Sequence, residues 1–272
     1  MRFRLLAILI AIFFCSQVGS ISAQQAPSAT TQPQASTLLA QSAVALAGSV
    51  AISDVTLTGT AQSVAGSDDE TGTVVLKAMA GGESRMDLTL SNGIRSEVRS
   101  LDSNGSPLGA WSGSDGVQHA IAYHNLLTDS SWFFPALTVR RLANLIGLIG
   151  TYVGQETLNG QSVLHVSFVR PPAVVTAPNA AVMQHLTQMD LYLDPTSVLP
   201  VALSYAVHAD DNELLDIPVQ ILFSNYKAIG GVEIPFHVQK LLNGSLSLDL
   251  QVQSAQMNSG LSASSFGIQV EQ

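Results

Sequence analysis

Apolar and polar residues alternate at every second position through most of the chain beyond residue 52. The clearest example is the stretch 246–252, in which leucine or valine occupies every even position and Ser247, Asp249 and Gln251 occupy the odd ones. Because successive side chains of a β-strand point to opposite faces of a sheet, this pattern predicts strands with one dry face and one wet face. Such one-sided strands are typical of antiparallel sheets.

Pairs of turn-forming residues separate the alternating stretches and predict tight hairpins. We expect about ten or eleven strands. Helices do not alternate with strands along the chain, so a parallel sheet built from βαβ units is not expected. The turn pairs are Gly81-Gly82, Asn92-Gly93, Asn159-Gly160, Gly230-Gly231 and Asn243-Gly244.

Two stretches have the helical period instead. Residues 36–48 begin with Ser36, a good N-cap, and end at Gly48, which favours helix termination. Residues 133–149 form the second predicted helix and the most apolar part of the mature chain. Its apolar positions at i, i+3, i+4 and i+7 are Leu142, Leu145, Ile146 and Ile149.

These elements predict a mainly β fold of the α+β class, formed by residues 36–272 as one domain. Two helices cannot easily cover about ten strands of a flat sheet, whereas a rolled sheet faces much of its apolar side with itself. We therefore expect a single curved antiparallel sheet of about 10–11 strands that forms a half-open barrel and is capped by the two helices.

The inner face of such a sheet either packs solidly or leaves a hollow. An empty hollow of about 400 Å³ would cost on the order of 10 kcal/mol, as much as the whole stability of a typical domain. The hollow must therefore be filled by the helices, open to water, or occupied by an apolar ligand. The predicted ligand-binding positions are Leu88, Leu90, Val98, Trp111, Leu142, Leu145, Ile146, Ile149, Leu191, Leu193, Phe223, Leu248 and Leu250.

The first 23 residues have the order of a secretory signal: Arg2 and Arg4, an apolar run over residues 5–14, and small residues up to Ala23. Cleavage near Ala23 would give an exported protein, in the periplasm or outside the cell, with residues 24–35 as a flexible leader. The apolar run is too short to span a bilayer comfortably, so no stable membrane anchor is expected. Cys15, the only cysteine, lies within this signal.

Charge excludes two classes of partner. The 272 residues have a formal net charge of −9, and 11% of them are charged. Nucleic-acid binding requires clustered lysine and arginine, so no nucleic-acid partner is expected. Peripheral binding to anionic membranes is disfavoured for the same reason.

The sequence indicates no catalytic residue, no metal site and no cofactor. No G-x-S-x-G nucleophile elbow occurs, so a hydrolase would need histidine, aspartate and serine from separate strands to converge. His165, His208 and His237 fall in separate predicted strands and could converge on a metal ion, but each is more simply interpreted as a strand-face residue. The acidic stretch 210–216 lacks the glycine and the spacing of a calcium loop, and we interpret it as a solvated loop.

The order of elements resembles that of the LolA/LolB-like lipoprotein-carrier superfamily. The matching features are the Asp194-Pro195 turn with Pro200 after it, residues 226–231 with Ile234 and Pro235, and Asn258, Leu261 and Phe266. Members of that superfamily are periplasmic half-barrels that hold acyl chains. The resemblance therefore implies a non-enzymatic protein that binds a lipid or lipoprotein acyl chain. The alternative is the same fold with a filled core, acting in envelope assembly or sensing through contacts with a protein partner.

Overall fold

The computed structural model describes residues 32–128, 130–170 and 179–268. The predicted signal peptide (residues 1–23) and residues 24–31 of the predicted leader lie outside these ranges. The described residues form three α-helices, two short 3₁₀ helices and thirteen strands. The helices are α1 (Gln32–Ala47), η1 (Tyr123–Leu126), α2 (Pro135–Asn144), α3 (Ala180–Leu186) and η2 (Ala263–Phe266). The strands are β1 (Asp54–Ala65), β2 (Asp68–Met79), β3 (Ser84–Leu90), β4 (Gly93–Leu101), β5 (Pro107–Ser112), β6 (Gln118–Ala120), β7 (Ile149–Leu158), β8 (Gln161–Val169), β9 (Met189–Leu193), β10 (Pro200–Ala209), β11 (Asn212–Ile229), β12 (Val232–Leu242) and β13 (Ser245–Met257).

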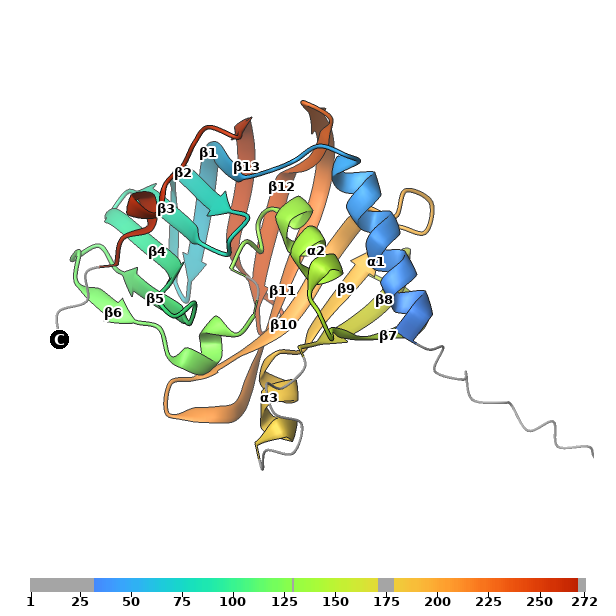
Figure 1. Cartoon of the computed structure of the whole chain (residues 1–272). Helices are drawn as coiled ribbons and strands as arrows, with labels where there is room; N and C mark the ends of the chain where they lie inside the picture. Colours follow the sequence, from blue (N-terminus) through green and yellow to red (C-terminus); the bar gives the residue numbers. More distant parts are fainter. Residues whose placement is uncertain (1–31, 129, 171–178, 269–272) are drawn as a thin grey trace, which may run out of the picture.

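The described strands form one antiparallel sheet that is not closed into a barrel (Figure 1). Its order is β6-β5-β4-β3-β2-β1-β13-β12-β11-β10-β9-β8-β7. The first and last strands of the chain, β1 and β13, therefore pair in the middle, and β6 and β7 are the free edges. The predicted fold class is confirmed. The strand number was underestimated because strands as short as β6 contain too few residues to show alternation.

The predicted hairpin turns lie where the sequence places them. Asn243 and Gly244, between β12 and β13, both adopt positive φ angles, 49° and 77°. A two-residue hairpin turn of type I′ requires positive φ at both central positions, and asparagine and glycine tolerate it best. This local preference sets the pairs next to the turn, Leu242 with Ser245 and Leu241 with Leu246, and a register shift after them brings Val238 opposite Leu250.

One predicted loop is instead part of a long hairpin. Strand β10 runs to Ala209 and β11 begins at Asn212, so most of the stretch 210–216 is strand rather than loop. His208 pairs with Asp216 in this hairpin. The polar composition misled the prediction because this end of the hairpin extends beyond the core, and both of its faces are then largely exposed.

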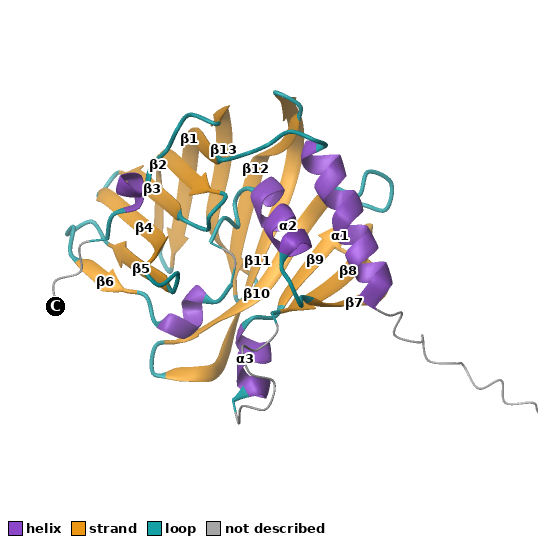
Figure 2. Cartoon of the chain, viewed as in Figure 1, coloured by secondary structure: helices purple, strands orange, loops and turns teal. Residues whose placement is uncertain are grey.

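Helices α1 and α2 lie across one face of the sheet, which we call the inner face (Figure 2). They pack on each other, and α1 also contacts β7 and β12. The helix α1 begins at Gln32, so residues 32–35 of the predicted leader are helical. Ala35 is completely buried in the core, which explains why the helix extends beyond the predicted cap at Ser36.

The inner face is not wholly apolar. Lys240 pairs with Leu248, and Glu97 pairs with Met86, so both charged side chains point to the same face as the core. Arg99 donates from Nε to Oε1 of Glu97 at 2.9 Å, and Nζ of Lys240 lies 5.0 Å from the ring centre of Trp132. Burial lowers the pKa of Lys240, with the charge of Glu97 opposing that shift.

Candidate functional site

Most of the predicted ligand-binding residues lie in one continuous hydrophobic core on the inner face. These residues are packed in the core with residues of the two helices, and of them only Leu142 also lines the apolar pocket described below. The predicted alternation holds over residues 248–252, since Leu248, Leu250 and Val252 are buried in this core and Asp249 is not. It is wrong for Leu246, because a register shift pairs Leu246 with Leu241 and places it on the face opposite the core. The buried members of the predicted set are Leu88, Leu90, Leu142, Leu191, Leu193, Phe223, Leu248 and Leu250.

Val98 lies on the opposite, outer face. It pairs with Arg85 and Ala110, whereas its neighbours Glu97 and Arg99 point inward. The helix η2, with a fully buried Phe266, packs against β4 and gives the outer face a small core of its own there. The prediction for Val98 was wrong because only the pairing of β4 with β3 decides which face each residue occupies.

Trp111 lies at the inner-face rim near the free edge formed by β6. Its side chain is 46% exposed and stacks on His119, with 4.5 Å between ring centres. The helices α1 and α2 lie over the other half of the sheet, so Trp111 is remote from the pocket described next.

The predicted helical face over residues 142–149 ends early. Helix α2 stops at Asn144, Leu145 is extended, and Gly147 has a φ of 77°. Ile146 is consequently 92% exposed, and Ile149 is the partly exposed first residue of β7. The i, i+3, i+4, i+7 spacing was thus misleading beyond Asn144, because glycine at positive φ allows the turn into β7.

An apolar pocket opens between α1, the end of α2, the α2–β7 turn and β8. Its volume is about 480 Å³, and no charged side chain lines it. Leu142 and Leu145 were predicted from the sequence, whereas the contribution of α1 was missed. Ser36 and Ala40 could have indicated the contribution of α1, because two small side chains leave space on one face of a helix. The lining consists of Ser36, Leu39, Ala40, Leu142, Ala143, Leu145, Gly147, Leu148, Gly150 and Phe168.

The aromatic segment before α2 belongs to the same hydrophobic core of the inner face. Trp132, Phe133 and Phe134 are all buried, and Phe133 and Phe134 are among the largest fully buried side chains of the described structure. The hollow predicted for the half-barrel is therefore largely closed by the protein itself. The apolar pocket at the β7 side stays open.

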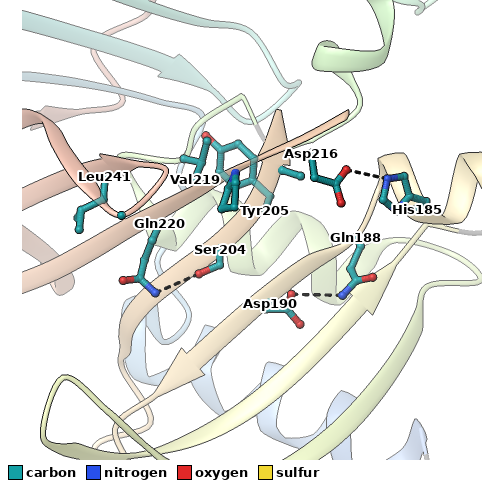
Figure 3. Close-up of a pocket in the computed structure, with 12 residues that line it drawn as sticks. His185, Gln188, Asp190, Ser204, Tyr205, Asp216, Val219, Gln220 and Leu241 are labelled. Atoms are coloured by element: carbon teal, nitrogen blue, oxygen red, sulfur yellow. Dashed lines mark hydrogen bonds and ion pairs between the residues drawn. The ribbon is translucent and has the colours of Figure 1, made fainter. Parts of the chain in front are cut away.

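A second, polar pocket of about 410 Å³ lies on the outer face of β9, β10 and β11 (Figure 3). His185 and Asp216 face each other at one end, and Gln188 bonds to Asp190 nearby. Asp190 also accepts a hydrogen bond from Nε2 of His165 at 3.0 Å. Burial alone would lower the pKa of His165, but the carboxylates of Asp190 and Glu156 outweigh it and raise that pKa.

A serine, a histidine and an aspartate converge on the outer face of β11, β12 and β13. Oγ of Ser224 lies 3.1 Å from Nδ1 of His237, and Nε2 of His237 lies 3.0 Å from Asp249. In Ser-His-Asp hydrolases Nε2 takes the serine proton and Nδ1 binds the carboxylate, so the order here is reversed. Asp249 also accepts hydrogen bonds from Gln239 and Gln251, as in a cross-strand polar network.

No described helix is both long enough and apolar enough to cross a membrane. The length of the longest described helix, α1, is 16 residues.

Comparison with known proteins reveals similarity in fold. Neither a family model nor a curated protein matches this sequence. An outer membrane lipoprotein-sorting protein domain from Vibrio parahaemolyticus is 12% identical, with a TM-score of 0.54 over 86% of this chain and 96% of that one. A DUF1329 family protein from Desulfovibrio piger is 11% identical, with a TM-score of 0.53 over the same shares. The LolA superfamily protein NE2245 from Nitrosomonas europaea is 9% identical, with a TM-score of 0.48 over 86% and 97%. The chain thus shares the fold of the lipoprotein-sorting domain and of the DUF1329 protein, and the resemblance in fold that the turn pattern predicted is confirmed.

Proposed function

We propose that the protein is an exported, non-enzymatic binding protein that holds a lipid or lipoprotein acyl chain in the apolar pocket. The observation that carries the proposal is the pocket itself: about 480 Å³, open to solvent between α1 and the α2–β7 turn, with an uncharged lining. Ligand pockets of useful size fall between about 300 and 1,000 Å³. The N-terminal signal pattern supports export to the periplasm or the cell exterior.

The energetics favour an apolar guest. Burying about ten methylene groups contributes roughly 8 kcal/mol, at about 0.8 kcal/mol for each group. An aliphatic lining imposes no stacking geometry, so an acyl chain can fit in several registers. The exposed Ile146 lies between Leu145 and Gly147, which line the pocket, and it offers a further apolar contact at the mouth.

The packed segment around Phe133 and Phe134 favours a second candidate function. A filled inner face leaves no long groove for several chains, and a protein of this kind would act in envelope assembly or sensing through contacts with a protein partner. The two candidates differ in whether the purified protein takes up a lipid.

Bulky substitutions in the pocket provide the test. Ala40 and Ala143 line the pocket on α1 and α2, and both are exposed enough to accept a larger side chain. We expect Ala40→Trp and Ala143→Trp to weaken binding of a fluorescent fatty acid at least tenfold, because the indole ring occupies the mouth. Val44→Trp, on an exposed part of α1 outside the lining, is the matched control and should bind as the wild type does.

Two results would refute the acyl-chain proposal. One is the absence of fluorescent fatty acid uptake by the wild type together with the absence of co-purified lipid in mass spectrometry. The other is uptake that is equally strong in Ala40→Trp, Ala143→Trp and Val44→Trp. Either result would favour the filled-core alternative.

A further inference from the structure

His185, His208 and Asp216 converge from three elements at one end of the polar pocket. His185 comes from α3, His208 from β10 and Asp216 from β11. One ligand atom from each residue can be chosen so that all three lie within 4.8 Å of one another. We call these three residues the histidine cluster.

The short contacts within the cluster centre on the carboxylate. Oδ1 of Asp216 lies 2.9 Å from Nε2 of His185 and 3.1 Å from Nε2 of His208. The centres of the His185 and His208 rings are 5.5 Å apart, and the planes of the two rings make an angle of 61°. Two ring nitrogens thus approach the same carboxylate oxygen from different directions.

His208 is the unusual member of the cluster. Its side chain is 1% exposed, yet neither Nδ1 nor Nε2 has a hydrogen-bond partner in the described structure. The contact with Asp216 has the distance of an ion pair but lacks the alignment of a hydrogen bond. A buried polar group without a hydrogen-bond partner destabilises the folded state, so this ring needs an explanation.

The backbone of His208 is held firmly in place. The side-chain amide of Asn125, a buried residue of η1, accepts a hydrogen bond from the N–H of His208 and donates one to its carbonyl oxygen, at 2.8 and 2.9 Å. The neighbouring His124 is committed elsewhere, because its Nε2 lies 3.1 Å from the carbonyl oxygen of Ala209. The ring of His208 is therefore presented to the cluster by a fixed strand.

We propose that His185, His208 and Asp216 bind a divalent transition-metal ion, with zinc as the best match. Zinc bonds to histidine nitrogen at about 2.0–2.1 Å and to carboxylate oxygen at about 2.0–2.2 Å. In a tetrahedral site these bond lengths place neighbouring ligand atoms about 3.3 Å apart. The observed 2.9 and 3.1 Å are close to that value, and the side chains of His185 and Asp216, 37% and 48% exposed, have room to adjust.

The donor set determines the class of metal. Imidazole nitrogen is a ligand for zinc, copper, iron and nickel, whereas magnesium and calcium prefer oxygen donors alone. Two histidines and one carboxylate leave a fourth position free, and two of the three residues, His185 and Asp216, line the polar pocket. Three protein ligands with an open position are compatible with a bound water or a small ligand at the metal.

The other histidine–carboxylate pairs of the described chain do not offer such a site. His237 approaches Asp249 without a second histidine. His165 contacts Asp190 through Nε2 and Glu156 through Nδ1. The two nitrogens of one ring point in different directions, so these carboxylates cannot share one ion with the ring. The histidine cluster is distinguished by two rings that approach one carboxylate.

Metal binding would join α3 to the β10–β11 hairpin. The helix α3 has only seven residues and follows a stretch outside the described residues. A bound ion would connect α3 to the two paired strands through coordinate bonds. A ligand that binds only the folded state raises the stability of that state. The melting temperature of the wild type is therefore expected to rise with zinc.

Zinc titration of the purified protein, without a histidine tag and after dialysis against a chelator, tests the proposal. We expect isothermal titration calorimetry to detect one Zn²⁺ per chain. His185→Ala and Asp216→Asn change partly exposed side chains, so both should fold, and each should weaken Zn²⁺ binding at least tenfold. His237→Gln removes a histidine from the pair with Asp249 and is the matched control, with an expected change of less than twofold.

Cobalt substitution supplies a second readout that does not depend on affinity. Bound Co²⁺ should give the visible absorption of a four-coordinate ion in the wild type and in His237→Gln, and should lose it in Asp216→Asn. Circular dichroism establishes that each variant is folded. The proposal is overturned if the wild type does not bind Zn²⁺, if both cluster variants bind it as well as the wild type, or if His237→Gln loses binding to the same extent.

Discussion

The carboxylate of Asp54, at the start of β1, accepts hydrogen bonds from both the backbone N–H and the hydroxyl of Ser259, each at 2.8 Å. The two residues are 205 positions apart in sequence. Gly260 N–H and the Ser53 hydroxyl also donate to this carboxylate. The buried carboxylate therefore joins the first strand of the sheet to the turn that follows the last one.

Replacement of Asp54 should destabilise the protein. We expect Asp54→Asn to lower the free energy of unfolding by about 1–3 kcal/mol, because the amide offers one acceptor oxygen and turns a donor toward N–H and O–H groups. Urea denaturation measures the change. Asp102→Asn is the control, since Asp102 accepts hydrogen bonds from Asn104 and Ser106 within a surface turn, and its effect should stay near 0.5 kcal/mol. Equal losses in the two variants would contradict the linking role of Asp54.

The contribution of Asp54 should also depend on pH. Burial alone would raise its pKa, but the hydrogen bonds from Ser259, Ser53 and Gly260 outweigh burial and leave the pKa below its ordinary value of 3.8. Stability from a carboxyl with a lowered pKa is present above the ordinary value and is lost as pH falls through the folded-state pKa. The stability difference between wild type and Asp54→Asn should therefore be constant between pH 5 and 7 and shrink in unfolding curves measured below about pH 4. A difference that stays constant down to pH 2 would show that the carboxylate charge is not involved.

Strand β13 allows a direct test of which face is dry. Leu248 is buried in the core, whereas Ser247 is partly exposed and lies at the register shift, where its hydroxyl donates to the carbonyl oxygen of Lys240. We expect Leu248→Asp to cost more than about 3 kcal/mol, because an unpaired charge enters an apolar environment. Ser247→Asp, one residue away, should cost less than about 1 kcal/mol. Similar melting temperatures for the two variants would mean that the face assignment is wrong.

His165 should stabilise the protein more at acidic than at alkaline pH. Its pKa is raised because Asp190 and Glu156 favour the charged ring more strongly than burial disfavours it. A group with a raised pKa contributes stability that is present below its ordinary value, 6.5, and is lost as pH rises through the folded-state pKa. The difference in unfolding free energy between wild type and His165→Gln should be larger at pH 5.5 than at pH 9. His119→Gln, at the Trp111 rim, serves as the control, and a His165→Gln difference that grows with pH would refute the ion pair.

The Ser224–His237–Asp249 network should not behave as a hydrolytic triad. The serine bonds to Nδ1, next to the ring's attachment to the chain, and the carboxylate bonds to Nε2. We expect no covalent labelling of Ser224 by a fluorophosphonate probe, as measured by intact-protein mass spectrometry. Labelling that is lost in Ser224→Ala would overturn this expectation and make a hydrolase activity the leading hypothesis.

The sequence alone determined the fold class, the hairpin positions and the dry face of residues 248–252. Strand alternation and the preference of Asn243-Gly244 for positive φ are local properties, readable without any long-range contact. The end of α1 before Gly48 is also a local property, because glycine favours helix termination. The turn pattern was sufficient to indicate the LolA-like half-barrel.

Only the tertiary structure decided where the open spaces and polar clusters lie. Val98 points outward because β4 pairs with β3 in a register that turns Glu97 and Arg99 inward, and a strand with so few apolar residues does not specify that register itself. Ile146 is exposed because the chain turns after Asn144 to start β7. His185, His208 and Asp216 meet because a short helix packs beside a long hairpin. Each of these outcomes depends on pairing and packing between distant segments, which the local period of apolar residues does not encode.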